Sequence, residues 1–222
     1  MNNAIASHPE PTNEVKKTLG RHMLADGFDF VMDFEKSQGS WIHDRITGKK
    51  FLDMFSMFGS ASIGYNHPYL MEKSAWLGRM AVNKPTLADV YSQEFADFMT
   101  VFERVAIPEH LQYAFFIEGG TMGVENAIKA CFDWKTRKNF EKGLDLEAGV
   151  CIHFKQAFHG RSGYTLSLTN TSDPRKYQYF PKFDWPRITN PHLNFPITEE
   201  NLAETIKHEN LALLNIEEAI LS

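Results

Sequence analysis

The chain has 222 residues, of which 43% are hydrophobic and 23% are charged, the composition of an ordinary globular protein. Its formal net charge is −5, so no basic excess favours binding to nucleic acid or to an anionic membrane. The two cysteines, Cys131 and Cys151, are too few for a disulfide framework, and residues 1–14 lack the apolar core of a secretory signal. We therefore expect a cytoplasmic protein.

The first half of the sequence predicts a polar arm, a small antiparallel meander and two helices. Residues 1–13 are polar and carry two prolines. Between residues 30 and 54, apolar and polar residues alternate between glycine-containing turns, which predicts short strands with one buried face. Pro68 is expected to open a helix that reaches Met80, and helical spacing of apolar residues predicts another over 88–105.

The second half alternates between strand and helix patterns. Residues 112–117 and 149–154 are continuous apolar runs, typical of strands buried on both faces of a parallel sheet. A helix with an apolar stripe is expected between them, and Thr198 is expected to cap a last helix. Residues 173–196 hold five of the ten prolines and predict an irregular surface segment. This alternation predicts an α/β domain with a mainly parallel sheet.

The strongest local signal lies at residues 115–124, where an apolar strand ends, three glycines follow and a helix begins. Unpaired N–H groups and the helix dipole attract an anion at such a start, and glycine lets a phosphate approach the backbone. Thr121 offers a hydroxyl donor as well. The spacing matches neither the dinucleotide fingerprint nor a Walker loop. A tight strand-to-helix connection without a ligand explains the same residues, so spacing alone leaves both readings open.

A second signal, at residues 157–163, follows the next strand and contains Phe158, His159, Gly160 and Arg161. At the carboxyl edge of an α/β sheet this loop is expected beside the first one, where ligands usually bind. An aromatic ring can stack on a flat ligand, and an arginine can grip a carboxylate with two hydrogen bonds. The alternatives are core packing for Phe158 and a surface ion pair for Arg161. Together, the two loops suit a planar, phosphorylated cofactor that reacts with an acid substrate.

Other kinds of site have little support in the sequence. The nine histidines form no H-x-x-x-H pair and the two cysteines are twenty residues apart, so we expect no metal site. The G-x-S-x-G motif of serine hydrolases is absent. No stretch approaches the roughly 20 apolar residues that a membrane span requires.

These motifs resemble the N-terminal half of the class III (ω-type) pyridoxal-phosphate-dependent aminotransferases, over most of residues 34–191. The matching stretches are 48–55, 66–68, 115–120, 124–129, 157–166 and 179–187. Within the family, Phe-Asp-Trp-Lys at 132–135 and the aromatic- and proline-rich run at 179–187 are similar to the L-lysine 6-aminotransferase branch.

The resemblance implies the type I fold of pyridoxal-phosphate-dependent transferases, incomplete in this chain. It is a mainly parallel sheet with helices on both faces, plus a small N-terminal α+β segment. The implied domains are an arm and helix at 1–27, the N-terminal segment of the small domain at 28–85, and the first half of the large cofactor domain at 86–222. The family also implies a homodimer in the full-length protein.

The resemblance also implies roles for individual residues. Gly120 and Thr121 would bind the phosphate of pyridoxal 5′-phosphate, Phe158 would stack on its ring, and Arg161 would bind the substrate α-carboxylate. The implied reaction converts L-lysine and 2-oxoglutarate into 2-aminoadipate 6-semialdehyde and L-glutamate, by ping-pong transfer through the cofactor. Met122 departs from the family, in which most members carry Glu at this position.

None of the lysines in the sequence stands in the context of the family's Schiff-base lysine, so no catalytic residue is assigned. We expect the chain to be the N-terminal portion of such an enzyme and to be inactive alone. Two alternatives stay open. One is a non-catalytic module that binds a phosphorylated ligand or pairs with another subunit, and the other is a different class III aminotransferase.

Overall fold

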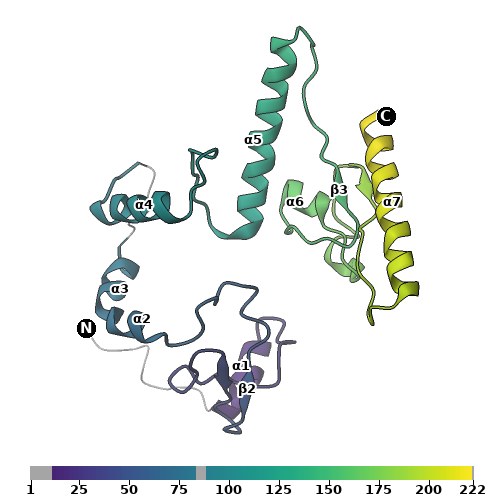
Figure 1. The fold of residues 1–222 in the computed structure, drawn as a ribbon. Helices are drawn as coiled ribbons and strands as arrows, with labels where there is room; N and C mark the ends of the chain where they lie inside the picture. The colour runs from purple at the N-terminus through teal and green to yellow at the C-terminus, as the bar shows by residue number, and fades with distance from the viewer. Residues whose placement is uncertain (1–11, 84–88, 222) are drawn as a thin grey trace. The chain divides into compact units, whose positions relative to one another are not determined.

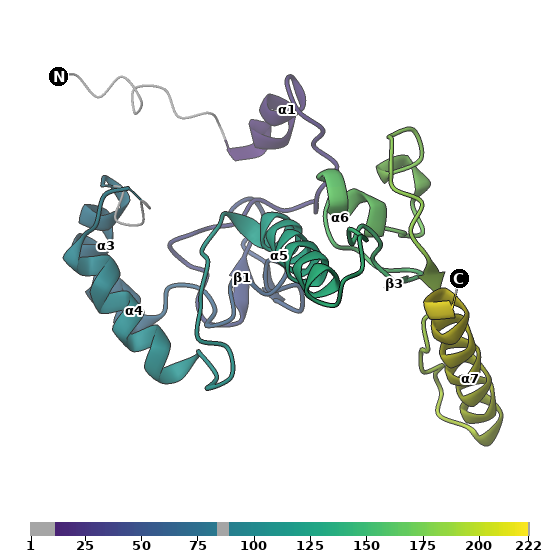
Figure 2. The ribbon, with the colours of Figure 1, turned by 90° about the horizontal axis from the view of Figure 1, so that it is seen from above.

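The computed structural model describes residues 12–83 and 89–221 (Figure 1 and Figure 2). The chain forms two compact units, Met1–Ile107 and Pro108–Ser222. Three sequence expectations lie outside the described residues: most of the polar arm at 1–13, the beginning of the helix expected from residue 88, and the domain boundary between residues 85 and 86. The three-part domain division therefore stays a prediction.

The first unit contains the predicted antiparallel meander. After a short 3-10 turn, η1 (Thr12–Glu14), and helix α1 (Val15–Gly20), strand β1 (Trp41–His43) pairs with β2 (Lys50–Leu52), and Ile42 lies opposite Phe51. The third expected strand is reduced to a single antiparallel bridge between Met32 and Asp44. The meander is thus confirmed, with its first member shortened.

Three helices follow in this unit: α2 (Pro68–Glu72), α3 (Ser74–Ala81) and α4 (Gln93–Val105). The helix expected from Pro68 to Met80 is interrupted at Lys73, where ψ of 8° departs from helical geometry. The next helix begins at Gln93 because the Ser92 hydroxyl accepts a hydrogen bond from the Phe95 N–H, a side-chain N-cap.

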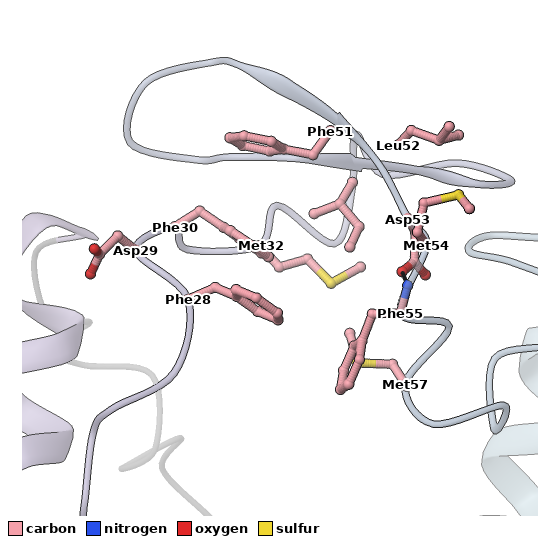
Figure 3. Close-up of a pocket in the computed structure, with 11 residues that line it drawn as sticks. Phe28, Asp29, Phe30, Met32, Phe51, Leu52, Asp53, Met54, Phe55 and Met57 are labelled. Carbon is pink, nitrogen blue, oxygen red and sulfur yellow. Dashed lines mark hydrogen bonds between the residues drawn. The ribbon is translucent and has the colours of Figure 1, made fainter. Parts of the chain in front are cut away.

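Aromatic side chains of the meander surround an open apolar hollow of about 840 Å³ (Figure 3). The Phe30 ring lies 5.7 Å from that of Phe28 and 5.4 Å from that of Phe51, centroid to centroid. The eleven lining residues are Phe28, Asp29, Phe30, Met32, Ile42, Phe51, Leu52, Asp53, Met54, Phe55 and Met57. Of these, Ile42 is buried, at 4% exposed, while Phe28 and Phe51 are exposed.

The second unit is built from helices around one short parallel strand pair. Its elements are α5 (Gly119–Glu141), β3 (His153–Phe154), α6 (Gly163–Leu168), the 3-10 turn η2 (Pro174–Lys176), β4 (Arg187–Ile188) and α7 (Glu199–Leu221). β3 and β4 run parallel, with His153 opposite Arg187. The Thr198 hydroxyl accepts a hydrogen bond from the Asn201 N–H at 3.2 Å, which confirms Thr198 as the cap of the last helix.

The core of the second unit lies where α5 and α6 pack side by side (Figure 2). Ile128 of α5, Leu168 of α6 and Trp185 form its buried centre, and four partly buried residues pack against it: Val124, Phe132, Cys151 and Tyr164. The Phe132 ring meets the Trp185 ring edge-on at 5.7 Å. The core therefore ties α5 to α6 through the apolar stripe that the sequence predicts for α5.

Three sequence expectations for this unit need correction. Residues 112–117 form no strand, and Tyr113 is 95% exposed. Burial on both faces needs strands and helices on both sides, whereas the described part of this unit contains a single parallel strand pair. The strand expected at 149–154 is only two residues long. The segment at 173–196 is not wholly superficial, because β4 lies within it and Trp185 and Ile188 are buried.

We predict that Gly64→Ala destabilises the first unit by about 2 kcal/mol or more, because two constraints act at this position. Gly64 has φ of +75°, and an added Cβ would lie 2.4 Å from the Gly39 carbonyl oxygen. Gly78 of α3 is the matched control, since nothing lies within 4 Å of its Cβ position; Gly78→Ala should be neutral or stabilising. Chemical denaturation measures both variants, and equal stabilities would contradict the prediction.

We also predict an acid-sensitive contribution from Asp44. Its carboxylate accepts a hydrogen bond from the Thr47 hydroxyl at 2.5 Å and others from the N–H groups of Val31, Ile46 and Thr47, which together lower its pKa to about 2. The stabilisation is therefore complete above the ordinary pKa of 3.8 and is lost as the pH falls towards 2. Asp44→Asn should flatten the stability–pH curve in this range, whereas Asn at the exposed Asp26 should leave it unchanged.

Candidate functional site

The first predicted loop forms the start of α5. Gly119, Gly120 and Thr121 already belong to its first turn, and Gly119 adopts φ of +75°, which favours glycine. The N–H groups of a first helical turn lack intrahelical acceptors, and the dipole of a 23-residue helix adds positive potential there. Glu118, at the N-cap position, makes no side-chain capping hydrogen bond. The turn thus has the donors that an anion requires.

The second predicted loop, residues 157–163, follows β3 and leads into α6. The Asn170 N–H donates to the Ala157 carbonyl at 2.8 Å, and the Asn170 side chain accepts from the Gln156 N–H at 3.1 Å. The fully buried Thr169 hydroxyl donates to the Gly160 carbonyl at 2.7 Å and accepts from the His159 N–H at 3.1 Å. These bonds fix the loop backbone on the residues that follow α6.

The two loops touch at Gly160 and Thr121. A Cβ added to Gly160 would lie 2.5 Å from both Cγ2 and Oγ1 of Thr121, and Gly160 has φ of +131°. Only glycine therefore allows this separation without a shift of one loop. The sequence expectation that these loops lie side by side is confirmed within the second unit.

A buried carboxylate that the sequence analysis missed joins the same elements. Glu125 of α5 is 8% exposed. It accepts hydrogen bonds from the Ser162 hydroxyl at 2.9 Å and from the N–H groups of Tyr164 and Thr165, both at 3.1 Å. Burial alone would raise the pKa of Glu125, but these bonds and the nearby Lys129 outweigh it, so the pKa is lowered. The signal in the sequence is a charged residue between Val124 and Ile128 on the apolar stripe.

Phe158 and Arg161 are both exposed on the second loop. Phe158 is 58% exposed, so the alternative of core packing is wrong for this ring. Arg161 lies between Gly160, which contacts Thr121, and Ser162, which donates to Glu125. The structure thus brings Gly120, Thr121, Phe158 and Arg161 onto two adjoining loops of one unit. The ligand-binding roles of these four residues stay predictions.

Two further findings concern the described residues, 12–83 and 89–221. No three His, Cys, Asp or Glu side chains gather there as potential metal ligands. In the same ranges, every helix is too short or too polar to cross a lipid bilayer.

Comparison with known proteins identifies the family. The sequence model of the class III aminotransferase family matches residues 24–220 of this chain. The chain belongs to this family. Among curated relatives, an L-lysine-epsilon aminotransferase of Amycolatopsis lactamdurans is 46% identical over 93% of this chain, and one of Mycobacterium tuberculosis is 47% identical over 90%. These alignments cover 46% and 45% of the relatives, so this class III chain spans about half their length.

Solved structures confirm the fold class. Lysine aminotransferase from M. tuberculosis, in its internal aldimine form, matches 94% of this chain with a TM-score of 0.83 and 46% identity, over 48% of its own length. A transaminase solved with L-alanine matches with a TM-score of 0.62 at 20% identity, which supports the fold alone. The type I fold is therefore shown, although the described sheet is narrower than the sequence predicts. Pyridoxal 5′-phosphate is the cofactor of this family, as the resemblance implies.

We predict that Gly160→Ala separates the two loops and lowers the free energy of unfolding by about 1–3 kcal/mol, because the new Cβ collides with Thr121 in a strained backbone region. Gly123 of α5 is the matched control, since its Cβ position is open; Gly123→Ala should be neutral or stabilise the helix by about 0.5–1 kcal/mol. Thermal and chemical denaturation measure the effect. A Gly160→Ala protein as stable as the Gly123→Ala protein would show that the loops do not meet at this point.

Proposed function

We propose that this chain carries the phosphate- and carboxylate-binding part of an L-lysine 6-aminotransferase, which converts L-lysine and 2-oxoglutarate into 2-aminoadipate 6-semialdehyde and L-glutamate. The observation that carries the proposal is the contact of Gly160 with Thr121, which unites a helix-start anion site with the loop that bears Phe158 and Arg161. Identity of 46–47% to proteins named L-lysine-epsilon aminotransferase supports the choice of substrate.

The start of α5 fits the phosphate of pyridoxal 5′-phosphate. Gly120 presents a backbone N–H with no side chain in the way, and nothing lies within 4 Å of its Cβ position. Thr121 adds an N–H and a hydroxyl, so a phosphate meets several donors at the positive end of the helix dipole. When bound, the cofactor supplies an aldehyde that takes up the amino group and a ring that withdraws electrons from the reacting carbon.

Phe158 and Arg161 fit the ring and the substrate. The exposed face of Phe158 can stack on the flat pyridine ring and exclude water from one side. The Arg161 guanidinium can hold an α-carboxylate with two parallel hydrogen bonds. If lysine is held by its α-carboxylate, the ε-amine at the far end of the side chain is free to reach the cofactor, which accounts for transfer of that amine.

Two alternatives are less well supported. Another class III aminotransferase is one, but the human mitochondrial 4-aminobutyrate aminotransferase is only 27% identical over 95% of this chain. A non-catalytic module that binds a phosphorylated ligand or pairs with another subunit uses the same loops, and turnover assays distinguish it from an enzyme. A cytoplasmic location, a homodimer in the full-length protein and inactivity of this chain alone stay predictions.

We predict that the purified chain binds pyridoxal 5′-phosphate and that Thr121→Val weakens this binding about 5- to 10-fold, as loss of one charge-assisted hydrogen bond costs about 1–1.4 kcal/mol. Arg161→Ala should spare the cofactor but abolish binding of glutarate, an unreactive dicarboxylate. Arg137→Ala, at an exposed position on α5, is the control and should change neither affinity. Isothermal titration calorimetry measures both ligands.

The same preparation tests for activity. Incubation with L-lysine and 2-oxoglutarate should yield no L-glutamate, because no lysine in the sequence matches the position that forms the covalent bond to the cofactor. Glutamate formation, together with a borohydride-reducible Schiff base between the cofactor and one of the chain's lysines, would contradict the expected inactivity. Failure to bind pyridoxal 5′-phosphate at millimolar concentration would contradict the proposed cofactor role itself.

A further inference from the structure

We propose that Glu125 is a positioning residue, which sets where the Arg161 loop lies relative to the phosphate-binding turn at Gly119–Thr121. The inference rests on the proposed function, since it concerns the same two ligand groups. It goes further because it proposes that one buried side chain, which contacts neither ligand, sets the distance between the phosphate-binding turn and Arg161.

The first step is the rigid link between Glu125 and the phosphate turn. Glu125 lies four residues after Thr121, one helical turn further along α5. Residues four apart lie on the same face of a helix. The backbone of α5 therefore fixes the distance along the helix between Glu125 and the first turn, which contains Gly120 and Thr121.

The second step is the link between Glu125 and the beginning of α6. Its Oε1 accepts from the Tyr164 N–H, while Oε2 accepts from the Thr165 N–H and the Ser162 hydroxyl. Tyr164 and Thr165 belong to the first turn of α6, where N–H groups lack intrahelical acceptors. A carboxylate from α5 thus caps α6 from outside, and both of its oxygens are occupied.

The third step concerns the residues on either side of Arg161. Gly160, just before it, packs against Thr121 so closely that no Cβ fits, and Ser162, just after it, donates to Glu125. The backbone of Arg161 is therefore attached on both sides to α5, the helix that begins with the phosphate turn. Gly163 adds to this fit, since its Cβ position lies 3.2 Å from Oε1 of Glu125.

The two ligand groups should respond differently when Glu125 is changed. The phosphate donors belong to α5 itself, so the first turn of that helix keeps its geometry without Glu125. The Arg161 loop depends on the carboxylate for one of its two attachments to α5. A positioning role therefore predicts loss of carboxylate affinity with phosphate affinity preserved, whereas a general loss of stability would weaken both.

The test compares Glu125→Gln with Glu141→Gln, a matched control at the exposed end of α5. In Glu125→Gln an NH2 group replaces one acceptor oxygen, so at least one of the three donors loses its partner. Affinities for glutarate and for pyridoxal 5′-phosphate are measured by titration calorimetry on the full chain. We expect Glu125→Gln to bind glutarate 5- to 10-fold more weakly and pyridoxal 5′-phosphate within 2-fold of wild type, and Glu141→Gln to match wild type for both.

Hydrogen exchange gives a second readout that needs no ligand. The Tyr164 and Thr165 amides should exchange at least 10-fold faster in Glu125→Gln, while amides in the middle of α5 keep their protection. If Glu125→Gln does not fold, Ser162→Ala removes one donor only and should show the same selective loss of glutarate affinity, to a smaller degree.

The outcomes separate the two proposals. Wild-type chain that binds neither probe overturns the proposed function, and the positioning role with it. If the wild-type chain binds both probes, and Glu125→Gln or Ser162→Ala weakens the two affinities equally, the positioning role is overturned. The proposed function is then left intact. Unchanged glutarate affinity in a folded Glu125→Gln protein also overturns the positioning role.

Discussion

The arrangement of the second unit depends on where one buried negative charge finds its donors. A carboxylate removed from water is strongly unfavourable unless hydrogen bonds replace its hydration. Glu125 obtains these bonds from the start of α6 and from Ser162. A six-residue helix is marginal by itself. The charge therefore stabilises α6, and the apolar contacts among Ile128, Leu168 and Trp185 hold the same two helices together.

Glycine plays the complementary part at the loops. The hydrogen bond from Ser162 to Glu125 holds the loop at 157–163 on α5, and the absence of a side chain at Gly160 lets the loop come within contact distance of Thr121. A similar combination of close approach and left-handed backbone occurs in the first unit at Gly64, against the backbone of Gly39. In each unit, a Cβ added to one of these glycines would collide with another segment, so the absence of a side chain there allows the two segments to meet.

Short sequence motifs were sufficient to predict the parts of the site whose residues are close together in the sequence. The glycines at the start of α5 and the aromatic-His-Gly-Arg run stand out because each is a short motif beside an apolar strand pattern. Glu125 escaped notice because its partners lie 37 to 40 residues away along the chain. The strand expected at 112–117 failed for a related reason: an apolar run shows that burial is favourable, but pairing depends on neighbouring strands that the run itself does not encode.

The double attachment of Arg161 to α5 has a consequence for the proposed function, in which two carboxylate substrates bind in turn. Its backbone is anchored through Gly160 and Ser162, whereas its side chain is exposed and carries several rotatable bonds. The Arg161 backbone is therefore fixed, while its guanidinium group can change position. If Arg161 binds carboxylates as proposed, the fixed backbone keeps the guanidinium near the phosphate turn, and rotation about the side-chain bonds lets it reach carboxylates on carbon chains of different length.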